Sequence, residues 1–267
     1  MYYVLTSREQ LLPFFPKVGV GAEIGVAQGD YSEAILAAAQ PRELHLVDPW
    51  SHLEDGSGLL NADRLLADTD AARSRGVAIE PPPANPQGDE LFSAVTRRFE
   101  SDARVKLNRQ YSYKAAMGFE AGTFDFVYLD GNHHYEFVLR DLQDWSRLLK
   151  PGGLLFGHDF FEDEFARKEN YGVIDAVGAF LKRSDFRFMM LTWEPFSTFC
   201  LARNLNGFAG AFLRNVLESE VPMIEIPDGF AAQYRDKAFR RRNGGVKRIP
   251  SFMSSAQFQL SYAPGRD

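Results

Sequence analysis

The first residues with chemical potential lie in a short segment, Glu23-Ile24-Gly25-Val26-Ala27-Gln28-Gly29. Gly25 allows the chain to turn sharply, and Gly29 lets a ligand approach the backbone at the start of a helix. The G-x-x-x-G spacing differs from the tighter G-x-G-x-x-G set of a pyrophosphate cradle. A carboxylate at Glu23 suits a ligand with a cationic or hydroxyl-rich end. An ordinary glycine turn between a strand and a helix is the alternative.

A second acidic residue, Asp48, follows the glycine turn and ends a predicted strand. A carboxylate about 20 residues after such a turn is placed to accept hydrogen bonds from two ribose hydroxyls. A capping or turn aspartate before Pro49 would explain Asp48 alone. Together, the glycine turn and Asp48 predict a cofactor that carries a nucleoside and does not require a phosphate.

These residues resemble the cofactor motifs of class I S-adenosylmethionine (SAM)-dependent methyltransferases. A later block is similar to the subgroup with a D-G-x-H motif, which includes macrocin-type sugar O-methyltransferases. This block comprises Tyr128-Leu129-Asp130-Gly131-Asn132-His133-His134-Tyr135, then Asp141, Trp145, Leu148-Leu149-Lys150-Pro151-Gly152-Gly153 and His158-Asp159. The resemblance covers roughly residues 21–203 and leaves out an insertion and the C-terminal tail.

The resemblance implies a set of cofactor-binding residues: Glu23, Gly25, Gly29, Asp48, Ser112 and Asp130. The first three would line the methionine and ribose part of SAM, and Asp48 would hold the ribose hydroxyls. Ser112 would lie near the adenine ring.

The resemblance also places Asp130 and His133 beside the transferred methyl group, as candidate catalytic residues. Because that methyl is carried on an electrophilic sulfonium, the protein mainly has to align the attack and remove a proton from the acceptor. Histidine titrates near neutral pH, so His133 is a suitable general base for a hydroxyl. A supporting histidine at the start of the next helix is the alternative, since His134 and His158 compete for the role.

A divalent metal is another way to acidify a hydroxyl. Asp130 and Asp159 offer hard oxygen ligands for Mg²⁺. Metal-using relatives usually have a second carboxylate or amide directly after the position of Asp159, where this chain has Phe160. Glu162 or Asp163 could reach back as the further ligand, with an acidic solvated loop as the alternative, so metal use stays open.

Alternating strands and helices must position these residues. Strands are predicted at 21–26, 43–48, 104–107, 124–130, 154–159, 186–192 and 197–202, and helices at 30–39, 89–99, 135–149 and 173–181. Asp30 and Glu33 form a capping-box pattern at the first helix. The last two strands are too close for a helical crossover and must be antiparallel. The order predicts a Rossmann-like, doubly wound α/β fold with a mostly parallel seven-stranded sheet and a terminal antiparallel hairpin.

Composition shifts predict the domain organisation. Four prolines in residues 80–88 indicate an extended loop, within a lid-like insertion at about 51–88 of a methyltransferase domain at 1–204. Residues 205–267 form a C-terminal extension, expected to pack on the core or on a partner subunit. Its basic run, 240–248, is interpreted as a solvated, partly mobile tail, with an anion or partner contact as the alternative.

Composition and charge narrow the function classes. The 267 residues are 45% hydrophobic and 25% charged, as in globular proteins, and the net charge of −6 argues against nucleic-acid binding as the main function. The one cysteine, Cys200, excludes an intramolecular disulfide and fits a reducing cytoplasm. No apolar run reaches about 18 residues, so no membrane partner is expected. The aromatic-rich tail leaves a homo-oligomer open.

The leading hypothesis is SAM-dependent O-methylation of a hydroxyl on a small metabolite or sugar. A nicotinamide-dependent oxidoreductase on a similar sheet is one alternative, although the G-x-x-x-G spacing counts against it. A non-catalytic protein that retains the methyltransferase fold is the other, because of Phe160 and the unmatched tail.

Overall fold

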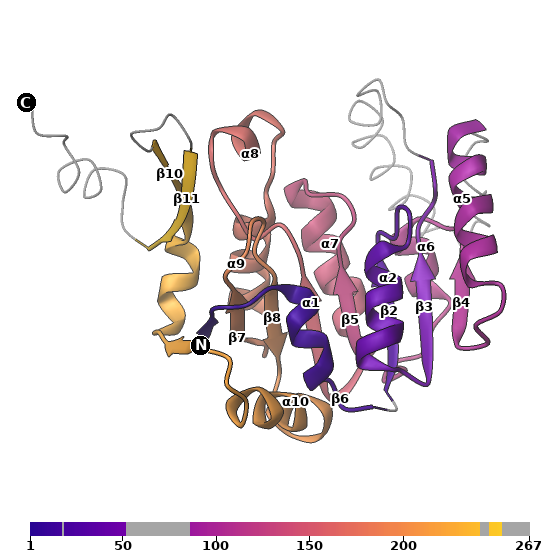
Figure 1. Ribbon diagram of the computed structural model, residues 1–267, viewed down its shortest axis with the longest axis horizontal. Helices are drawn as coiled ribbons and strands as arrows, with labels where there is room; N and C mark the ends of the chain where they lie inside the picture. The colour runs from indigo at the N-terminus through magenta and orange to yellow at the C-terminus, as the bar shows by residue number, and fades with distance from the viewer. Residues whose placement is uncertain (18, 52–85, 241–245, 253–267) are drawn as a thin grey trace, which may run out of the picture.

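A nine-stranded sheet lies at the centre of the computed structural model, which describes residues 1–17, 19–51, 86–240 and 246–252 (Figure 1). The strand order is β4-β3-β2-β5-β6-β8-β7-β1-β9. Neighbours from β4 to β6 are parallel, and β8 is antiparallel to β6 and β7. The strands are β1 (Tyr2–Val4), β2 (Val20–Ile24), β3 (Glu43–Val47), β4 (Val105–Asn108), β5 (Phe124–Leu129), β6 (Leu149–Gly157), β7 (Arg187–Thr192), β8 (Phe199–Ala202) and β9 (Met223–Glu225).

The predicted doubly wound, mostly parallel α/β architecture is confirmed, with β7 and β8 as its antiparallel hairpin. Two strands that were not predicted, β1 and β9, extend the sheet beyond β7. Each is 3 residues long, which is too short for an alternating apolar pattern to stand out. The central sheet therefore contains the seven expected strands and two more.

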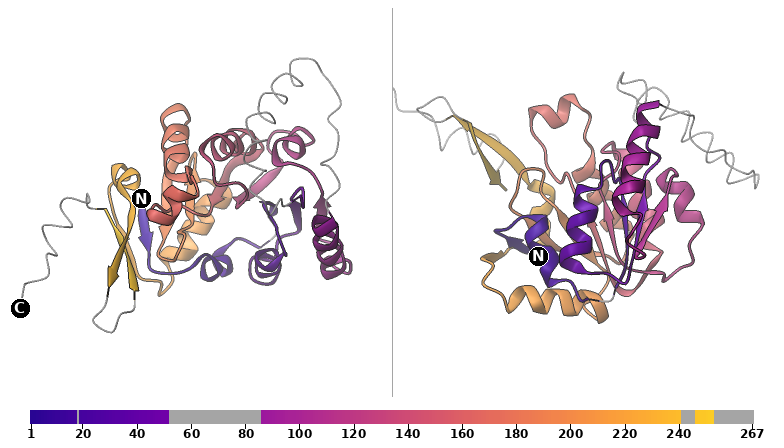
Figure 2. Two further views of the ribbon diagram at one scale, coloured as in Figure 1. Left: turned by 90° about the horizontal axis from the view of Figure 1, so that it is seen from above. Right: turned by 45° about the vertical axis from the view of Figure 1, so that its right-hand side comes forward.

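Helices cover both faces of the sheet (Figure 2). One face carries α6 (Ser112–Met117), α7 (Tyr135–Ser146) and α9 (Val173–Arg183). The other carries α1 (Arg8–Leu11), α2 (Asp30–Ala34), the π-helical η2 (Ile35–Ala39), α5 (Pro86–Phe99) and α10 (Gly207–Leu217). The remaining short helices are η1 (Leu12–Phe14), α8 (Glu164–Lys168) and η3 (Asp228–Gln233).

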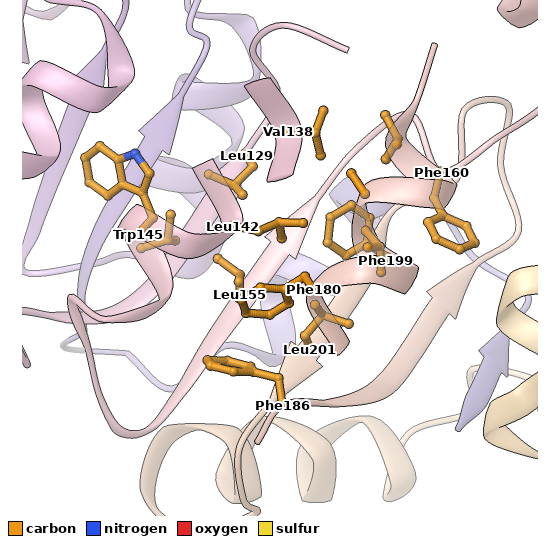
Figure 3. Close-up of a cluster of buried hydrophobic side chains, with 14 of the residues drawn as sticks. Leu129, Val138, Leu142, Trp145, Leu155, Phe160, Phe180, Phe186, Phe199 and Leu201 are labelled. Atoms are coloured by element: carbon orange, nitrogen blue, oxygen red, sulfur yellow. The ribbon is translucent and has the colours of Figure 1, made fainter. Parts of the chain in front are cut away.

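The core beneath α7 fixes this helix over the sheet (Figure 3). Val138, Leu142 and Trp145 recur three or four residues apart, so they lie on one face of the helix. They belong to the same buried cluster as Leu129 of β5 and Leu155 of β6. This packing positions the connection between β5 and α7, which carries both predicted catalytic residues, Asp130 and His133.

One helix begins where it was predicted but with another cap, and a second helix begins earlier than predicted. Helix α2 begins at Asp30, and Gly29 takes the cap position. The predicted capping box is wrong because the carboxylates of Asp30 and Glu33 form ion pairs with Arg98 of α5 instead. Helix α5 begins at Pro86, so the end of the predicted proline loop is helical. Proline is well tolerated in the first turn of a helix, where its missing N–H costs nothing.

The described residues after 204 pack partly on the sheet. Helix α10 lies against β6 and buries Phe212 and Val216. Strand β9 pairs with β1. Strands β10 (Arg235–Arg240) and β11 (Val246–Ser251) form a separate antiparallel pair. Part of the basic run that was interpreted as a tail therefore lies on a β-hairpin.

The insertion predicted at 51–88 lies, apart from its two ends, outside the described residues. The domain division at 204 stays a prediction. Among the described residues, none of the helices has both the length and the apolar character needed to cross a bilayer.

The order of strands reverses beside β2, because the chain runs outward through β3 to β4 and then returns to β5 on the other side. Ligands of such sheets bind at this reversal, beyond the carboxyl ends of the strands. Gly25 lies there with a φ of +89°. A Cβ at this position would stand 2.0 Å from the backbone oxygen of Asp130. Only glycine therefore lets β2 and β5 end side by side.

We expect Gly25→Ala to destabilise the protein clearly more than Gly122→Ala, as measured by urea denaturation. Gly122 has a similar φ of +75°, but a Cβ there would have nothing within 4 Å. Gly122→Ala should thus cost only the backbone strain, about 1 kcal/mol. Gly25→Ala should cost about 2 kcal/mol more, because backbone atoms must move apart. Equal losses for the two variants would contradict the close contact.

Candidate active site

Asp48, directly after β3, braces the glycine turn. Its Oδ2 accepts hydrogen bonds from the backbone N–H groups of Val26 at 2.8 Å and Ala27 at 3.0 Å. Its Oδ1 accepts one from the N–H of Trp50 at 2.6 Å, and the residue is 3% exposed. The predicted contact with ribose hydroxyls stays a prediction, because it requires one of these bonds to be replaced or the free lone pair of Oδ1 to become accessible.

Trp50 packs against the same glycine turn. Its side chain is fully buried, and its indole Nε1–H donates to the backbone oxygen of Ala27 at 2.9 Å. The ring also packs against Phe92 of α5, with centroids 4.9 Å apart. In this arrangement Trp50 packs on the glycine turn and does not wall an open pocket.

Glu23, near the end of β2, is buried and faces α2. Oε2 of its carboxyl group accepts a hydrogen bond from Ser32 Oγ at 2.5 Å, and the residue is 1% exposed. Burial raises the pKa of Glu23 to about 8, against a smaller opposing effect of the Ser32 hydrogen bond. Gly29 is likewise in contact with protein, since a Cβ there would lie 2.7 Å from the ring of Phe99. In this arrangement Glu23 and Gly29 contact other parts of the protein beside the glycine turn, and their predicted contacts with a cofactor stay a prediction.

Asp130, His133 and Asp159 meet beyond the carboxyl ends of β5 and β6, where they line one pocket together with His158. His133 Nε2 lies 2.7 Å from Asp159 Oδ2. His158 Nδ1 lies 3.6 Å from both Asp130 Oδ1 and Asp159 Oδ2. The structure thus brings together the predicted catalytic pair and Asp159, and it adds His158 between the two carboxylates.

His158 and Asp159 each stabilise the charged form of the other. Burial disfavours the charged form of His158, but Asp130 and Asp159 outweigh it and raise the pKa of His158 to about 9. Burial likewise opposes the charge of Asp159, but His133 and His158 outweigh it and hold its pKa well below the usual range. At neutral pH, Asp159 is therefore ionised and His158 is protonated.

Arg8 completes the site, and sequence reasoning missed it. It begins α1, and its Nη1 donates to Asp130 Oδ2 at 2.7 Å and to the hydroxyl of Tyr128 at 2.9 Å. Asp130 is 122 positions away in the chain, so no local pattern links the two residues. The available signal is an arginine that closely follows β1, and this short strand was itself not predicted from the sequence.

Ser112 lies at the start of α6 and joins this helix to α7. Its hydroxyl donates to Asp141 Oδ1 at 2.5 Å and accepts from Trp145 Nε1 at 2.7 Å. Burial raises the pKa of Asp141 to about 7, although the hydrogen bond from Ser112 opposes this shift. The predicted position of Ser112 near an adenine ring stays a prediction, and Asp141 extends the polar lining of the pocket on that side.

The residues after Asp159 turn away from the pocket. Phe160 is 1% exposed and packs against Phe188 and Phe199. Glu162 forms ion pairs with Arg167 and Arg235. Asp163 caps α8, where its Oδ1 accepts from the N–H of Ala166 at 2.9 Å. Neither acidic side chain reaches back toward Asp130, so one condition for the predicted metal site is not met in this arrangement.

The family profile described as a methyltransferase domain matches residues 22–160, slightly more than half of the chain. The protein therefore belongs to this methyltransferase family, and the resemblance to class I SAM-dependent methyltransferases is confirmed. The matched range contains the glycine turn, Asp48, Asp130, His133 and Asp159, whereas Arg8 lies outside it. Membership of the D-G-x-H subgroup stays a prediction. No curated protein sequence matches the chain.

Solved structures with a related arrangement include several methyltransferases. The N-methyltransferase NodS from Bradyrhizobium japonicum WM9 is 12% identical, with a TM-score of 0.46 over 72% of this chain and 90% of that chain. A SAM-dependent methyltransferase from Aquifex aeolicus is 14% identical, with a TM-score of 0.46 over 74% and 88%. An O-methyltransferase family protein from Burkholderia thailandensis is 12% identical, with a TM-score of 0.45 over 72% and 54%. These similarities do not bear on the acceptor.

We expect Glu23→Gln to remove a loss of stability that the wild-type protein suffers as pH rises. The pKa of Glu23 is about 8 when folded and 4.5 as its ordinary value, so between these values the folded state keeps a proton that the unfolded chain has lost. The contribution of Glu23 to the free energy of unfolding is therefore largest below pH 4.5 and falls as pH rises toward 8. At pH 7 the variant should exceed the wild type by an amount on the order of 3 kcal/mol.

Urea denaturation at a series of pH values measures this difference. Glu100→Gln, at an exposed glutamate, is the matched control and should leave the pH profile unchanged. A stability difference between Glu23→Gln and the wild type that does not vary between pH 5 and pH 8 would contradict the assignment.

Proposed function

We propose that the protein is a SAM-dependent methyltransferase that transfers the methyl group to a hydroxyl of a small metabolite or sugar. The observation that carries the proposal is the meeting of Asp130, His133 and Asp159 beside the Gly25 turn, at the reversal of the sheet. A proton acceptor therefore lies next to the place where ligands of such sheets bind. The family match supports a methyltransferase over a nicotinamide-dependent oxidoreductase.

Asp130, directly after β5, and Arg8, at the start of α1, fit the charged part of SAM. The side chain of Asp130 is 21% exposed and carries a carboxylate, and the side chain of Arg8 is 20% exposed and carries a guanidinium. Such a pair of opposite charges suits the zwitterionic amino-acid end of the cofactor. When bound, SAM supplies a methyl group on a sulfonium, which is electrophilic without further activation.

His133 is the proposed general base. Its Nε2 is held by Asp159, which leaves Nδ1 as the nitrogen that can accept a proton from the acceptor hydroxyl. Tyr171 stacks on the His133 ring at a centroid distance of 4.5 Å, and the N–H of Gly172 donates to the His133 backbone oxygen at 2.8 Å. These contacts fix the ring while Asp159 stabilises the charge that forms on it.

His158 has a different role, because a pKa of about 9 keeps it protonated at neutral pH. A protonated imidazole cannot act as a base. Placed between Asp130 and Asp159, His158 instead offsets their negative charges and holds the two carboxylates in position.

Mg²⁺ does not fit these residues well. One ligand atom each from Asp130, His133 and Asp159 lies within 4.8 Å of the others, but Mg²⁺ prefers oxygen ligands to imidazole. Arg8 and His158 already provide positive charge next to both carboxylates. A divalent cation would have to compete with them and with the bond between His133 and Asp159. We therefore assign no step to a metal.

We expect His133→Ala to lower kcat by roughly 10²- to 10⁴-fold, because the proton acceptor is lost. The dissociation constant for S-adenosylhomocysteine (SAH), measured by calorimetry, should stay within about twofold, since the base acts on the acceptor. His134→Ala is the matched control, because this neighbour is bonded to Asn170 and does not face Asp159. The proposed base is wrong if His133→Ala retains full turnover. Cofactor binding without transfer to any acceptor in a broad panel of hydroxyl compounds would favour the non-catalytic alternative.

We expect turnover to survive complete chelation of divalent cations. After dialysis against EDTA, kcat should change by less than about twofold, because deprotonation relies on His133 and Asp159. An acceptor that is methylated at a measurable rate is assayed before and after dialysis, with and without added Mg²⁺. Loss of activity that Mg²⁺ alone restores would instead make Asp130 and Asp159 metal ligands.

A further inference from the structure

Arg8 lies outside the range that the methyltransferase profile matches, yet its side chain is bonded to Asp130 of the candidate site. It begins α1, whereas the family profile starts at residue 22. Its guanidinium lies over the ring of Tyr31, with the Cζ atom 4.4 Å from the centroid, and Tyr31 belongs to the helix that follows the glycine turn. Its Nη1 donates to the hydroxyl of Tyr128 in β5 and to the carboxylate of Asp130, which directly follows β5. Arg8 therefore spans the reversal between β2 and β5.

The backbone of Arg8 is fixed independently of its side chain. Its N–H donates to both carboxylate oxygens of Glu194, at 3.0 and 3.1 Å. Glu194 is itself held by the hydroxyl of Thr192 at 2.6 Å, at the end of β7. The hairpin of β7 and β8 thus holds the start of α1 in place, so a ligand that binds Arg8 would restrict little further conformational freedom of the backbone.

Part of the guanidinium is not used by the protein. Nη1 and Nε have partners, the latter being Glu9 Oε1 at 3.1 Å. Nη2 has no hydrogen-bond partner among the described residues. An arginine carries five N–H donors, two of them on Nη2, so two remain for another acceptor. Burial disfavours the charge, but Tyr128 and Asp130 outweigh it and raise the pKa of Arg8 above its ordinary value, which keeps the group cationic.

We propose that Arg8 binds the α-carboxylate of the cofactor, with Asp130 facing the α-ammonium group. This inference rests on the proposed function and names a binding residue for it. Arginine binds carboxylates through paired N–H donors, and Nη1 of the same guanidinium is bonded at 2.7 Å to Asp130, whose carboxylate can accept from an ammonium. The adjacent positive and negative charges of Arg8 and Asp130 complement the carboxylate and the ammonium group that an α-amino acid carries on one carbon.

A purely structural role, in which Arg8 only ties α1 to β5, makes a different prediction. Loss of a structural tie would weaken every ligand of the site alike. Loss of a carboxylate contact would weaken only ligands that carry this group. The comparison of SAH with 5′-methylthioadenosine, which has the same nucleoside and sulfur but no amino-acid end, separates the two roles.

The test is calorimetric titration of the full chain and its variants with both ligands. Arg8→Met should weaken SAH roughly 10- to 100-fold, the loss expected for a charged hydrogen bond, and should leave 5′-methylthioadenosine within about twofold. Arg8→Lys should lie between the two proteins for SAH. Arg203→Met is the matched control. Arg203 also pairs with an aspartate and lies over an aromatic ring, but it follows β8 at the amino ends of the parallel strands, away from the site. It should change neither affinity.

Equal weakening of both ligands by Arg8→Met, or no weakening of either, would overturn the inference. Should Arg8→Met fail to fold, the SAH analogue with a carboxamide in place of the carboxylate asks the same question of the wild-type protein, and equally tight binding of that analogue would also overturn it. If the wild-type protein binds neither SAH nor 5′-methylthioadenosine, the proposed function itself fails.

Discussion

The architecture of the site depends on one close contact between backbones. Gly25 lies where a Cβ would stand 2.0 Å from the Asp130 oxygen, and the N–H of Asp130 donates to the Ile24 oxygen at 2.7 Å. This contact makes β2 and β5 end together, at the reversal of the sheet. The glycine turn and the polar residues after β5 consequently lie next to each other, and the latter line a pocket. A side chain at position 25 would separate the feature that suits a nucleoside cofactor from those that suit proton transfer.

Around that pocket, the chemistry follows from how the charges are balanced. Two carboxylates, Asp130 and Asp159, are each flanked by positive groups, Arg8 on one side and His158 between them. His133 is the histidine in direct contact with one carboxylate alone, and this arrangement suits a base that must gain and lose a proton. The same balance leaves little electrostatic attraction for a further divalent cation. Charge balance therefore links the proposed base and the absence of a metal step to one set of distances.

The sequence predicted best what local patterns encode. The apolar run of β5 and the stripe of α7 fixed the sheet and placed Asp130 and His133 at its edge. Long-range partners could not be predicted. Arg98 takes the carboxylates that a capping box would use, and Arg8 meets Asp130 across 122 positions. Asp48 could be located at the end of its strand, but three backbone donors occupy its carboxylate, and such bonds have no sequence signal.

A crystal structure of the protein with bound SAH tests the central claim most directly. The account predicts that the ligand lies along the Gly25 turn, with its carboxylate on Arg8 Nη2, its ammonium group facing Asp130, and its sulfur directed toward His133. The open question at Asp48 would be answered by the same map, through the partners of its two oxygens. A ligand bound elsewhere, or an empty crevice at Gly25 under saturating SAH, would contradict the account.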